Sequence, residues 1–383
     1  MMPFFLFVFF LLMVAYAVLI AYYHKAWNRM PEFVLPEKQA SVFISVIVAA
    51  RNEEKNIQHL LHSLYQQQYA KHLYEVIIVD DHSTDNTWAL LQQSRFENLQ
   101  LKTIRLEEHV TGQNAIASYK KKAIETGIHA AAGTLIVTTD ADCRFNPLWL
   151  QTIAAFYETH QAKFIAAPVT YTTNKTLLSV FQTIDFLTLQ GITAASVYKR
   201  FHSMCNGANL AYEKAAFHEV NGFDNIDTIA SGDDMLLMHK IFSRYPDHVF
   251  YLKSREAIVT TEPAASWKQF FHQRIRWASK ADRYDDKRIF WVLLLVYLLN
   301  VFFLAGAVAS FFKSIWLFFV LLLLLAKVLI EFPFVNSVAI FFGQQRLMKY
   351  FPFLQPLHIT YTIIAGWLGK FGSYEWKGRR IKK

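Results

Sequence analysis

Residues 42–54 read VFISVIVAARNEE, and residues 75–85 read EVIIVDDHSTD. In both stretches a run of β-branched and other apolar residues ends abruptly in polar residues, which is typical of a buried strand that leads into a loop. Residues 53–65 and 87–94 follow these runs with the periodicity of helices. The two stretches therefore predict two strand–helix units in succession, with strands over residues 42–50 and 75–80.

The same alternation continues further along the chain. Residues 99–106 and 134–139 are predicted strands, and residues 118–132 between them are a predicted helix. The complete order is β-α-β-α-β-α-β, which predicts an α/β fold with a doubly wound, mostly parallel sheet covered by helices on both faces. Ligands of such sheets bind at the carboxyl ends of the strands.

The first of these strand ends excludes two common nucleotide-binding patterns. The turn reads Ala50-Arg51-Asn52-Glu53 and contains no glycine. It lacks both GxGxxG and GxxxxGK[ST], so a dinucleotide-binding dehydrogenase and a P-loop enzyme lose their main support.

Long apolar tracts lie on either side of this α/β region. Residues 4–23, 289–312 and 315–342 are almost entirely apolar, and about 20 helical residues span the hydrocarbon core of a bilayer. Lys25 and Arg29 follow the first tract rather than precede it, which favours an uncleaved anchor over a secretory signal. By the positive-inside rule, the domain that follows the anchor is expected in the cytoplasm.

The C-terminal region is less regular. A last apolar stretch, residues 351–371, is interrupted by Pro352, Pro356 and several glycines and leads into a basic tail, so we expect it either to span the membrane or to be re-entrant. Lys327 and Glu331 lie one helical turn apart inside the third tract. We interpret them as a mutually neutralising pair, with contact to a lipid substrate as the alternative.

These patterns predict five regions. They are an N-terminal anchor (1–30), a cytoplasmic domain (41–265), an amphipathic interface helix (266–288), a transmembrane hairpin (289–343), and a third apolar segment with the basic tail (351–383). The net charge of +9 arises largely beside the apolar tracts, where anionic lipid headgroups attract cations, so lipid rather than nucleic acid is the expected partner. Cys143 and Cys205 are the only cysteines in the sequence and suggest no disulfide framework.

Four polar constellations are candidates for chemistry. Asp80 and Asp81 end the second strand, where carboxylates can accept hydrogen bonds from a nucleobase or a ribose, although the residues after them could equally cap the next helix. Asp140 and Asp142 end the fourth strand, and two oxygen ligands near one point suit Mg²⁺ or Mn²⁺ bridging a diphosphate, with a plain polar turn as the alternative.

The other two constellations lie further along the chain. Asp233 and Asp234 precede a helical run over residues 235–242, where a carboxylate is either a helix cap or a general base. Gln273, Arg276 and Trp277 share one face of the amphipathic stretch 267–278. They suit contact with a diphosphate and an acceptor sugar, or else a basic helix on lipid headgroups.

Taken in chain order, the segments VIVAARNEE, VDDHSTD, TTDADC, SGDDM and QRIRW resemble glycosyltransferase family 2, the inverting enzymes with a GT-A fold. The resemblance covers residues 41–278. It implies that Arg51, Asn52, Glu53, Asp80 and Asp81 hold the nucleobase and ribose, that Asp140 and Asp142 hold the ribose, metal and diphosphate, and that Asp234 is the base with Asp233 beside it. It also implies that Gln273, Arg276 and Trp277 form the QxxRW signature, and that Asn206 and Gly207 line the donor sugar and acceptor.

This chain departs from the family pattern at two places. The family often has a Gly-Lys pair before the strand that leads into its DxD motif, which is Asp140-Ala141-Asp142 here. Only Lys120 of Tyr119-Lys120 matches that pair, and it is carried over as a diphosphate contact. The base motif usually reads Glu-Asp, whereas this chain has Asp233-Asp234, which shortens the first carboxylate.

The resulting hypothesis is a metal-dependent, membrane-bound inverting glycosyltransferase that moves a sugar from a nucleotide-sugar donor to a lipid-linked or other membrane-resident acceptor. The expected location is a bacterial inner membrane, with several spans and a cytoplasmic catalytic domain. Three alternatives remain: a processive polysaccharide synthase of the same family, a nucleotidyltransferase, and a non-catalytic membrane scaffold.

Overall fold

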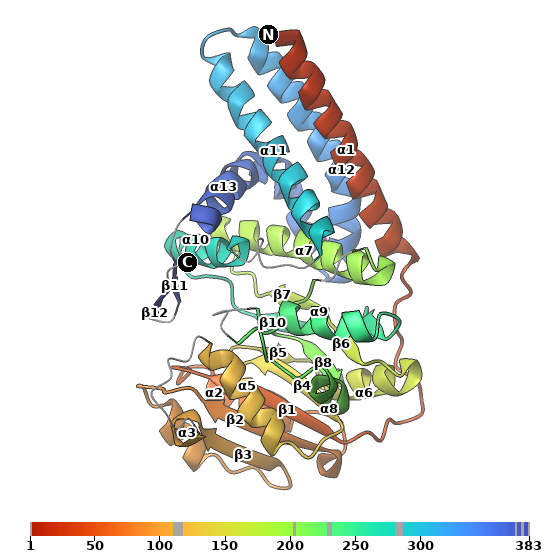
Figure 1. Ribbon diagram of the computed structural model, residues 1–383, viewed down its shortest axis with the longest axis vertical. Coiled ribbons are helices and arrows are strands. Elements are labelled where there is room, and N and C mark those ends of the chain that lie inside the picture. Colours follow the sequence, from red (N-terminus) through yellow and green to blue (C-terminus); the bar gives the residue numbers. More distant parts are fainter. Residues whose placement is uncertain are drawn as a thin grey trace. The chain divides into compact units, whose positions relative to one another are not determined.

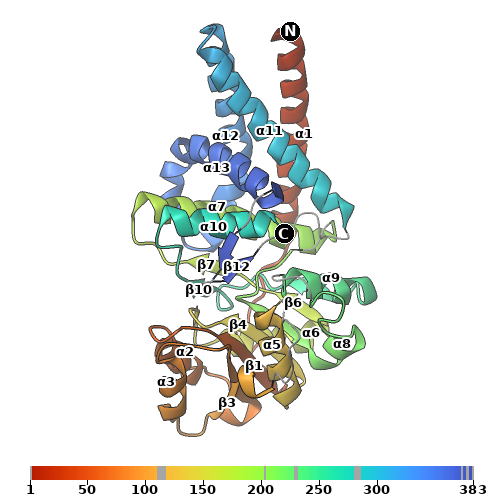
Figure 2. The same ribbon diagram turned by 60° about the vertical axis from the view of Figure 1, so that its left-hand side comes forward.

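The computed structural model describes residues 2–109, 118–201, 204–227, 232–279, 286–371, 374–376 and 379–381. The chain divides into two compact units (Figures 1 and 2). The sheet unit comprises Pro31–Tyr171 and Ser203–Glu262, and the helical unit comprises Met1–Met30, Thr172–His202 and Pro263–Lys383. Each unit is described by itself.

The sheet unit is built on a seven-stranded sheet in the order β3-β2-β1-β4-β8-β6-β9. Its strands are β1 (Ile44–Ala50), β2 (Tyr74–Asp80), β3 (Gln100–Arg105), β4 (Leu135–Asp140), β6 (Phe164–Ala166), β8 (Leu210–Glu213) and β9 (Val249–Tyr251). Strands β3, β2, β1 and β4 are parallel to one another, whereas β8 runs antiparallel to both β4 and β6. The predicted α/β class with a mostly parallel sheet is confirmed.

The register of the parallel strands sets the strand ends level with one another. Ala50 pairs with Asp80, and Ala49 pairs with Asp140, so the polar loops that follow β1, β2 and β4 begin at one edge of the sheet. Every residue of β2 is buried, as expected for a central strand of a parallel sheet that is covered on both faces.

Helices of the sheet unit alternate with the strands. They are α2 (Ile57–Tyr65), η1 (Lys71–Leu73), α3 (Thr87–Gln93), α4 (Leu106–His109), α5 (Tyr119–Ala130), α6 (Trp149–His160), α8 (Lys214–Glu219) and α9 (Met235–Arg244). Helix α5 lies close to β1, because a Cβ on Gly127 would fall 2.6 Å from Cγ2 of Ile47. A smaller sheet joins β5 (Arg144–Phe145), β10 (Val259–Thr261) and β7 (Val169–Tyr171).

Helix α2 begins later than the periodicity predicts. Asn52 has a left-handed φ of 54°, which a right-handed helix does not accommodate. The backbone N–H of Glu53 donates to Oγ1 of Thr87 at 2.7 Å, and that of Glu54 donates to a carboxylate oxygen of Asp85 at 3.1 Å. These contacts hold the segment as a loop, so the helix starts only at Ile57.

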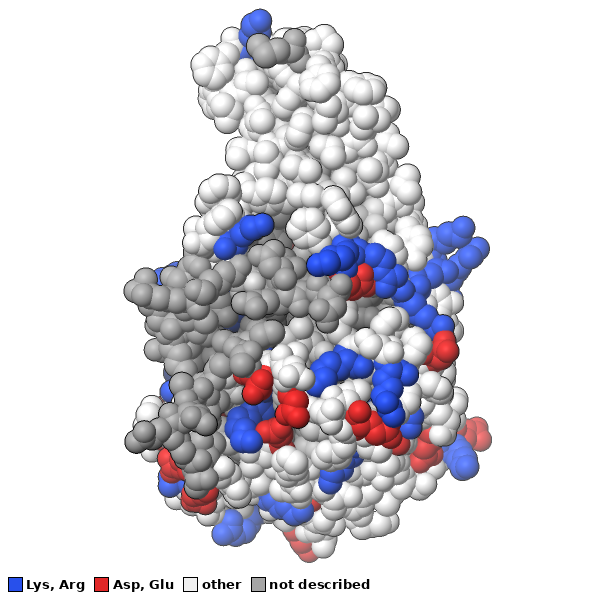
Figure 3. Space-filling view, in the orientation of Figure 1, with Lys and Arg blue, Asp and Glu red and all other residues white. Residues whose placement is uncertain are grey.

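The helical unit contains α1 (Met2–Arg29), α7 (Leu177–Lys199), α10 (Trp267–Ala278), α11 (Lys287–Ser310), α12 (Ile315–Phe341), η3 (Gln345–Tyr350), α13 (Phe351–Phe371) and the antiparallel pair β11 (Tyr374–Trp376) and β12 (Arg379–Ile381). Four of these described helices, α1, α7, α11 and α12, are long and apolar enough to cross a membrane. On the face drawn in Figure 3, the part formed by the long helices carries almost no charged side chains along its length. Long apolar helices at both chain ends therefore agree with the predicted tracts.

Two features of this unit differ from the sequence prediction. Helix α7 was not predicted, because polar residues such as Gln182 and Asp185 interrupt its apolar pattern. Most of its residues are buried. Helix α13 is continuous, although Pro352 and Pro356 led us to expect an interruption. Pro352 lies in the first turn, where its missing N–H would have no helical partner in any case. Part of the predicted basic tail, including Lys377, Lys382 and Lys383, lies outside the described residues.

Lys327 and Glu331 form a buried ion pair on α12, with 2.5 Å between Nζ and Oε1. Gln355 of α13 binds both side chains, and the hydroxyl of Tyr16 on α1 donates to Glu331. The contacts agree with the interpretation of a mutually neutralising pair, since protein groups surround both charges.

Candidate active site

The loops after β1 and β2 meet through Arg51 and Asp81. Nη1 of Arg51 donates to the backbone carbonyl of Asp81 at 3.0 Å and lies 3.6 Å from its carboxylate. Nδ1 of His82 is 2.9 Å from the same carboxylate. Asn52 connects the loops a second time, because its side-chain oxygen accepts the backbone N–H of Thr84 at 2.8 Å. Both Asn52 and His82 have left-handed φ angles, so the two turns are tightly constrained.

Asp80 has an open hydrogen-bonding position. It is buried at the end of β2, and its Oδ2 accepts the backbone N–H of Ser83 at 3.3 Å. Its Oδ1 is also buried, and it has no hydrogen-bond partner among the described residues. A buried carboxylate oxygen without a partner is unusual in proteins and fits a ligand that supplies an N–H or O–H donor.

Carboxylates crowd together at the end of β4. Oδ2 of Asp142 accepts a hydrogen bond from Oγ1 of Thr261 at 3.0 Å. Burial, followed by the charges of Asp140 and Glu53, raises the pKa of Asp142 to about 6. The strand ends of β1 and β4 therefore share one region of negative charge, which favours a bound cation.

This donor set fits a divalent metal only in part. The described residues contain no group of three or more His, Cys, Asp or Glu side chains arranged to hold a metal ion. Mg²⁺ in phosphate-transfer sites is commonly held by one or two carboxylates together with phosphate oxygens and water. Asp140 and Asp142 fit that arrangement, with the remaining ligands supplied from outside the protein.

Lys120, at the start of α5, connects the DxD loop to the loop before α9. Its Nζ lies 2.8 Å from Oδ1 of Asp140 and 3.3 Å from Oδ2 of Asp233. Burial lowers the pKa of Lys120, but the charges of Asp140 and Asp233 outweigh that effect, and the pKa is held well above its usual value. The ammonium group therefore stays charged and pairs with both loops.

Asp234 is the N-cap of α9. One carboxylate oxygen accepts the N–H of Met235 at 2.8 Å, and the other accepts the N–H of Gly207 at 3.1 Å. Gly232 has a φ of 87°, a backbone conformation that favours glycine, at the turn that leads into this cap. The cap and the proposed base are compatible, because each carboxylate oxygen can accept more than one hydrogen bond. Ser231 of the motif lies outside the described residues.

The Asn206–Gly207 loop lies against the same acidic cluster. Oδ1 of Asn206 accepts the N–H of Ala208 at 3.0 Å and so shapes the turn. A Cβ on Gly207 would lie 3.5 Å from both Oδ2 of Asp233 and Nζ of Lys120. The loop therefore belongs to the cluster, and its contact with a donor sugar and acceptor stays a prediction.

The sheet unit thus brings its predicted site residues together from six segments of the chain. Its two linked parts are the loops of Arg51, Asn52, Asp80 and Asp81, and the cluster of Glu53, Lys120, Asp140, Asp142, Asn206, Gly207, Asp233 and Asp234. Thr261 also belongs to this site and was not predicted. No sequence signal marks it, since it reaches Asp142 only through the pairing of β10 with β5 and β7.

The QxxRW residues belong to the helical unit. Gln273, Arg276 and Trp277 lie on α10, whose bounds match the predicted amphipathic stretch. Oε1 of Gln273 is buried without a hydrogen-bond partner among the described residues. The contact of these three residues with a diphosphate or an acceptor stays a prediction.

Comparisons with known proteins agree with this fold. A mannosyltransferase from Pyrobaculum calidifontis, solved in complex with GDP-Man and Mn²⁺, matches 96% of each chain with a TM-score of 0.56 and 18% identity, which shows a shared fold. A beta-monoglucosyldiacylglycerol synthase from Nostoc sp. is 28% identical over 274 residues, 69% of this chain and 54% of the relative. Glycosyltransferase AglE from Haloferax volcanii is 34% identical over 111 residues, 28% of this chain and 33% of the relative. The matches thus span about a third to a half of these curated relatives.

Two family models match the chain. The model described as "Glycosyl transferase family 2" matches residues 45–220, which contain the loops of Asp81 and Asp142. The model described as "Glycosyl transferase family group 2" matches residues 135–365, which extend from β4 into α13 and include Asp234 and the QxxRW helix. Because this second match covers more than half of the sequence, the chain belongs to glycosyl transferase family group 2.

Proposed function

We propose that this chain transfers a sugar from a nucleotide-sugar donor to a lipid or another membrane-resident acceptor, in the presence of Mg²⁺ or Mn²⁺ and with inversion at the anomeric carbon. The observation that carries the proposal is the acidic cluster in which Lys120 pairs with both Asp140 and Asp233. This pairing joins the DxD loop to the loop of Asp234, as direct displacement at one centre requires.

The donor half of the site supports the nucleotide part of the proposal. The partnerless Oδ1 of Asp80 suits an N–H or O–H of the nucleobase or ribose, with Arg51 and Asp81 fixing the loop around it. A metal on Asp140 and Asp142 would neutralise charge on the leaving diphosphate. The mannosyltransferase with the same fold was solved with GDP-Man and Mn²⁺, which agrees with this assignment.

Asp234 is the proposed general base. Its carboxylate would take the proton of the acceptor hydroxyl as that oxygen attacks the anomeric carbon. The N–H groups of Met235 and Gly207 hold the carboxylate in place, so little reorganisation is needed when the acceptor arrives. No second carboxylate nucleophile is required for an inverting displacement.

The membrane-resident acceptor is supported by the helical unit. Helices α1, α11 and α12 are long enough to span a bilayer, and the QxxRW helix α10 precedes α11 in the chain. One relative is named a beta-monoglucosyldiacylglycerol synthase, a name that denotes a glycosylated lipid product. Diacylglycerol is therefore the first acceptor to test.

The test uses the purified full chain in vesicles that contain diacylglycerol, with a panel of UDP-, GDP- and dTDP-sugars and either Mn²⁺ or a chelator. We expect metal-dependent transfer from one donor. Asp234→Asn should reduce transfer by about 100-fold or more while leaving donor affinity nearly unchanged. Asp224→Asn, at an exposed aspartate outside the site, is the matched control and should retain full transfer.

Three outcomes would count against the proposal. Undiminished transfer by the Asp234→Asn variant would remove Asp234 as the base. Release of pyrophosphate instead of a nucleoside diphosphate would indicate a nucleotidyltransferase. A ladder of long products in a length analysis of radiolabelled product would favour a processive synthase over a single addition.

A further inference from the structure

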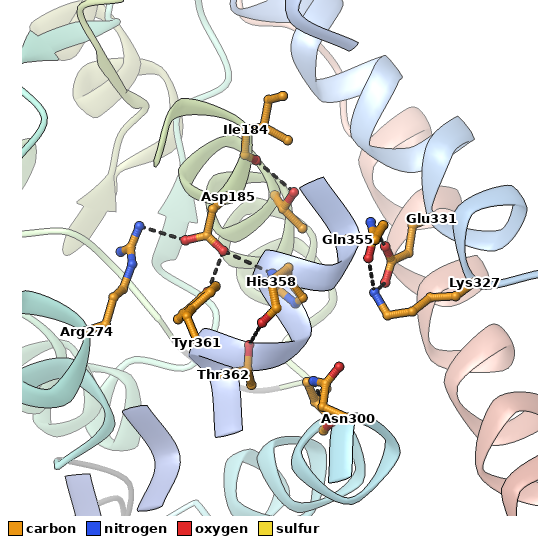
Figure 4. Close-up of polar contacts among 12 residues, drawn as sticks. Ile184, Asp185, Arg274, Asn300, Lys327, Glu331, Gln355, His358, Tyr361 and Thr362 are labelled. Atoms are coloured by element: carbon orange, nitrogen blue, oxygen red, sulfur yellow. Dashed lines mark hydrogen bonds and ion pairs between the residues drawn. The ribbon is translucent and has the colours of Figure 1, made fainter. Parts of the chain in front are cut away.

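Helices α7, α10 and α13 meet at a buried ion pair. Nη2 of Arg274 on α10 lies 2.7 Å from Oδ2 of Asp185 on α7, and the two side chains are 3% and 2% exposed. The hydroxyl of Tyr361 on α13 donates to Oδ1 of Asp185 at 2.5 Å, and Nδ1 of His358 lies 3.3 Å from that oxygen. Figure 4 shows these side chains converging on Asp185 from different helices.

Arg274 connects this cluster to the signature helix. It is one of the two residues between Gln273 and Arg276, and its guanidinium carbon lies 4.3 Å from the centre of the Trp277 ring. The same carbon lies 5.0 Å from the centre of the Phe270 ring, one turn earlier. Residues at these spacings share one face of a helix, so the guanidinium packs against both rings while Asp185 binds it.

The C-terminal end of α10 also packs tightly against α13. A Cβ on Gly369 would fall 2.6 Å from Cβ of Ala278, so only glycine allows this approach. The ring of Tyr361 lies 5.3 Å from that of Phe270. Helix α10 is therefore supported at several points on one side, and Asp185 supplies a charged contact among them.

We propose that Asp185 is a positioning residue for the QxxRW helix, and that it acts through Arg274 to fix the ring of Trp277. The role of Trp277 in transfer rests on the proposed function, but the positioning itself does not. Asp185 holds the guanidinium through a close charge contact of 2.7 Å between two buried groups, and removing one charge of such a pair is strongly unfavourable. Loss of the Asp185 charge removes this contact, so the guanidinium should shift relative to the Trp277 ring.

The experiment labels the full chain in detergent micelles with 5-fluorotryptophan and records ¹⁹F spectra. Trp277→Phe identifies the Trp277 resonance. We expect Asp185→Asn to move that resonance beyond its wild-type line width, and Asp185→Glu to restore it. Arg274→Lys keeps the charge but loses the planar group, so it should move the resonance as well and serves as a second variant if Asp185→Asn does not fold.

Glu331→Gln is the matched control, since it also replaces the carboxylate of a buried ion pair by an amide in the same unit. Glu331 pairs with Lys327 on α12, and its side chain also accepts hydrogen bonds from Tyr16 on α1 and Gln355 on α13. The inference is overturned if the Trp277 resonance stays within its line width in both Asp185→Asn and Arg274→Lys. It is equally overturned if Glu331→Gln moves the resonance as far as Asp185→Asn does, because the effect would then be general loosening.

A kinetic measurement separates this inference from the proposed function. With diacylglycerol vesicles as the probe, Asp185→Asn should lower kcat/KM for the acceptor by about 10- to 100-fold, the scale expected for a misplaced contact, with the donor KM within about twofold of wild type. If the wild-type chain transfers no sugar at all, the proposed function fails while the ¹⁹F result still decides the positioning role. If transfer occurs and the resonance does not move, only the positioning role fails.

Discussion

At the scale of single residues, the ionised carboxylate of Asp142 lowers the stability of the metal-free fold. Its raised pKa, about 6, means that the metal-free fold disfavours its charged form. A carboxyl whose folded pKa lies above its unfolded value binds protons more tightly in the folded state. The fold is therefore more stable below the unfolded pKa, and this contribution is lost as the pH rises through about 6.

Because the contribution of Asp142 to stability falls as the pH rises, we can predict the effect of Asp142→Asn. With a chelator present at pH 7.5, the variant should be more stable than the wild type by up to about 2 kcal/mol, because the amide removes a disfavoured charge and can still accept from Thr261. The gain should disappear near pH 4, where the wild-type carboxyl is protonated. Thermal unfolding of the full chain at both pH values measures it, and an equal or lower melting temperature at pH 7.5 would contradict it. Asp224→Asn should show no gain at either pH.

Lys120 offers a second prediction at this scale. It pairs with Asp140 and Asp233 at once, so Lys120→Met should be coupled energetically to both Asp140→Asn and Asp233→Asn. Double-mutant cycles in urea with a chelator should give coupling energies of roughly 0.5–3 kcal/mol for each pair. The more exposed pair Lys122–Glu125 is the control, with an expected coupling below about 1 kcal/mol. Coupling to only one aspartate would show that Lys120 does not bridge the two loops.

At the scale of elements, the sequence predicted the strands and helices that have a clear hydrophobic pattern, and missed most of the others. Strands β1, β2 and β4 are rich in apolar and β-branched residues, and their positions agree with the prediction to within two residues. Strands β6 and β9 have three residues each, too few for a periodicity to emerge. Helix α7 was missed because Gln182 and Asp185 interrupt its pattern, and both are buried by contacts with segments distant in the sequence.

The candidate site shows the same difference between residues in local motifs and residues placed by distant contacts. Asp81, Asp142 and Asp234 were found because they lie in short motifs directly after a strand or before a helix. Thr261 and Asp185 were not found, because each contacts a residue far away in the chain. Thr261 lies 119 residues from its partner Asp142, and the partner of Asp185 is Arg274. Sequence motifs thus reveal candidate site residues in the loops more readily than residues that contact them from distant parts of the chain.

The buried pair on α12 gives a prediction at the scale of elements. Glu331→Gln alone should lower the free energy of unfolding by about 3–5 kcal/mol, since it leaves the Lys327 charge buried without its anion. Replacing all four polar members together, as Y16F/K327M/E331L/Q355M, should restore stability to within about 2 kcal/mol of wild type. Unfolding in a denaturant titration of the micelle-bound chain measures both variants. Sugar transfer by the fourfold variant should stay near the wild-type rate, and a large loss would instead favour contact between this pair and a lipid substrate.

At the scale of the whole molecule, the distribution of charge along the helical unit predicts its orientation in a membrane. Lys25 and Arg29 lie at the end of α1, Lys287 and Arg288 at the start of α11, and Arg346 and Lys349 in η3 after α12, whereas the turn between α11 and α12 has only Lys313. Figure 3 shows basic side chains gathered at one end of the nearly uncharged helices. With three spans, the positive-inside rule places the end of α1 and the segment after α12 together in the cytoplasm.

Helix α13 then decides where the C-terminus lies. It was not found among the helices apolar enough to span a membrane, and its exposed residues Phe353, Trp367 and Phe371 suit a helix that lies in the interface. We therefore predict that the C-terminus stays in the cytoplasm: a fluorescent protein fused there should fluoresce, and alkaline phosphatase fused there should be inactive. The same two reporters inserted at residues 312–314 are the control and should give the opposite result. Active alkaline phosphatase at the C-terminus would mean that α13 crosses the bilayer, and Trp367 and Phe371 would then face lipid tails rather than headgroups.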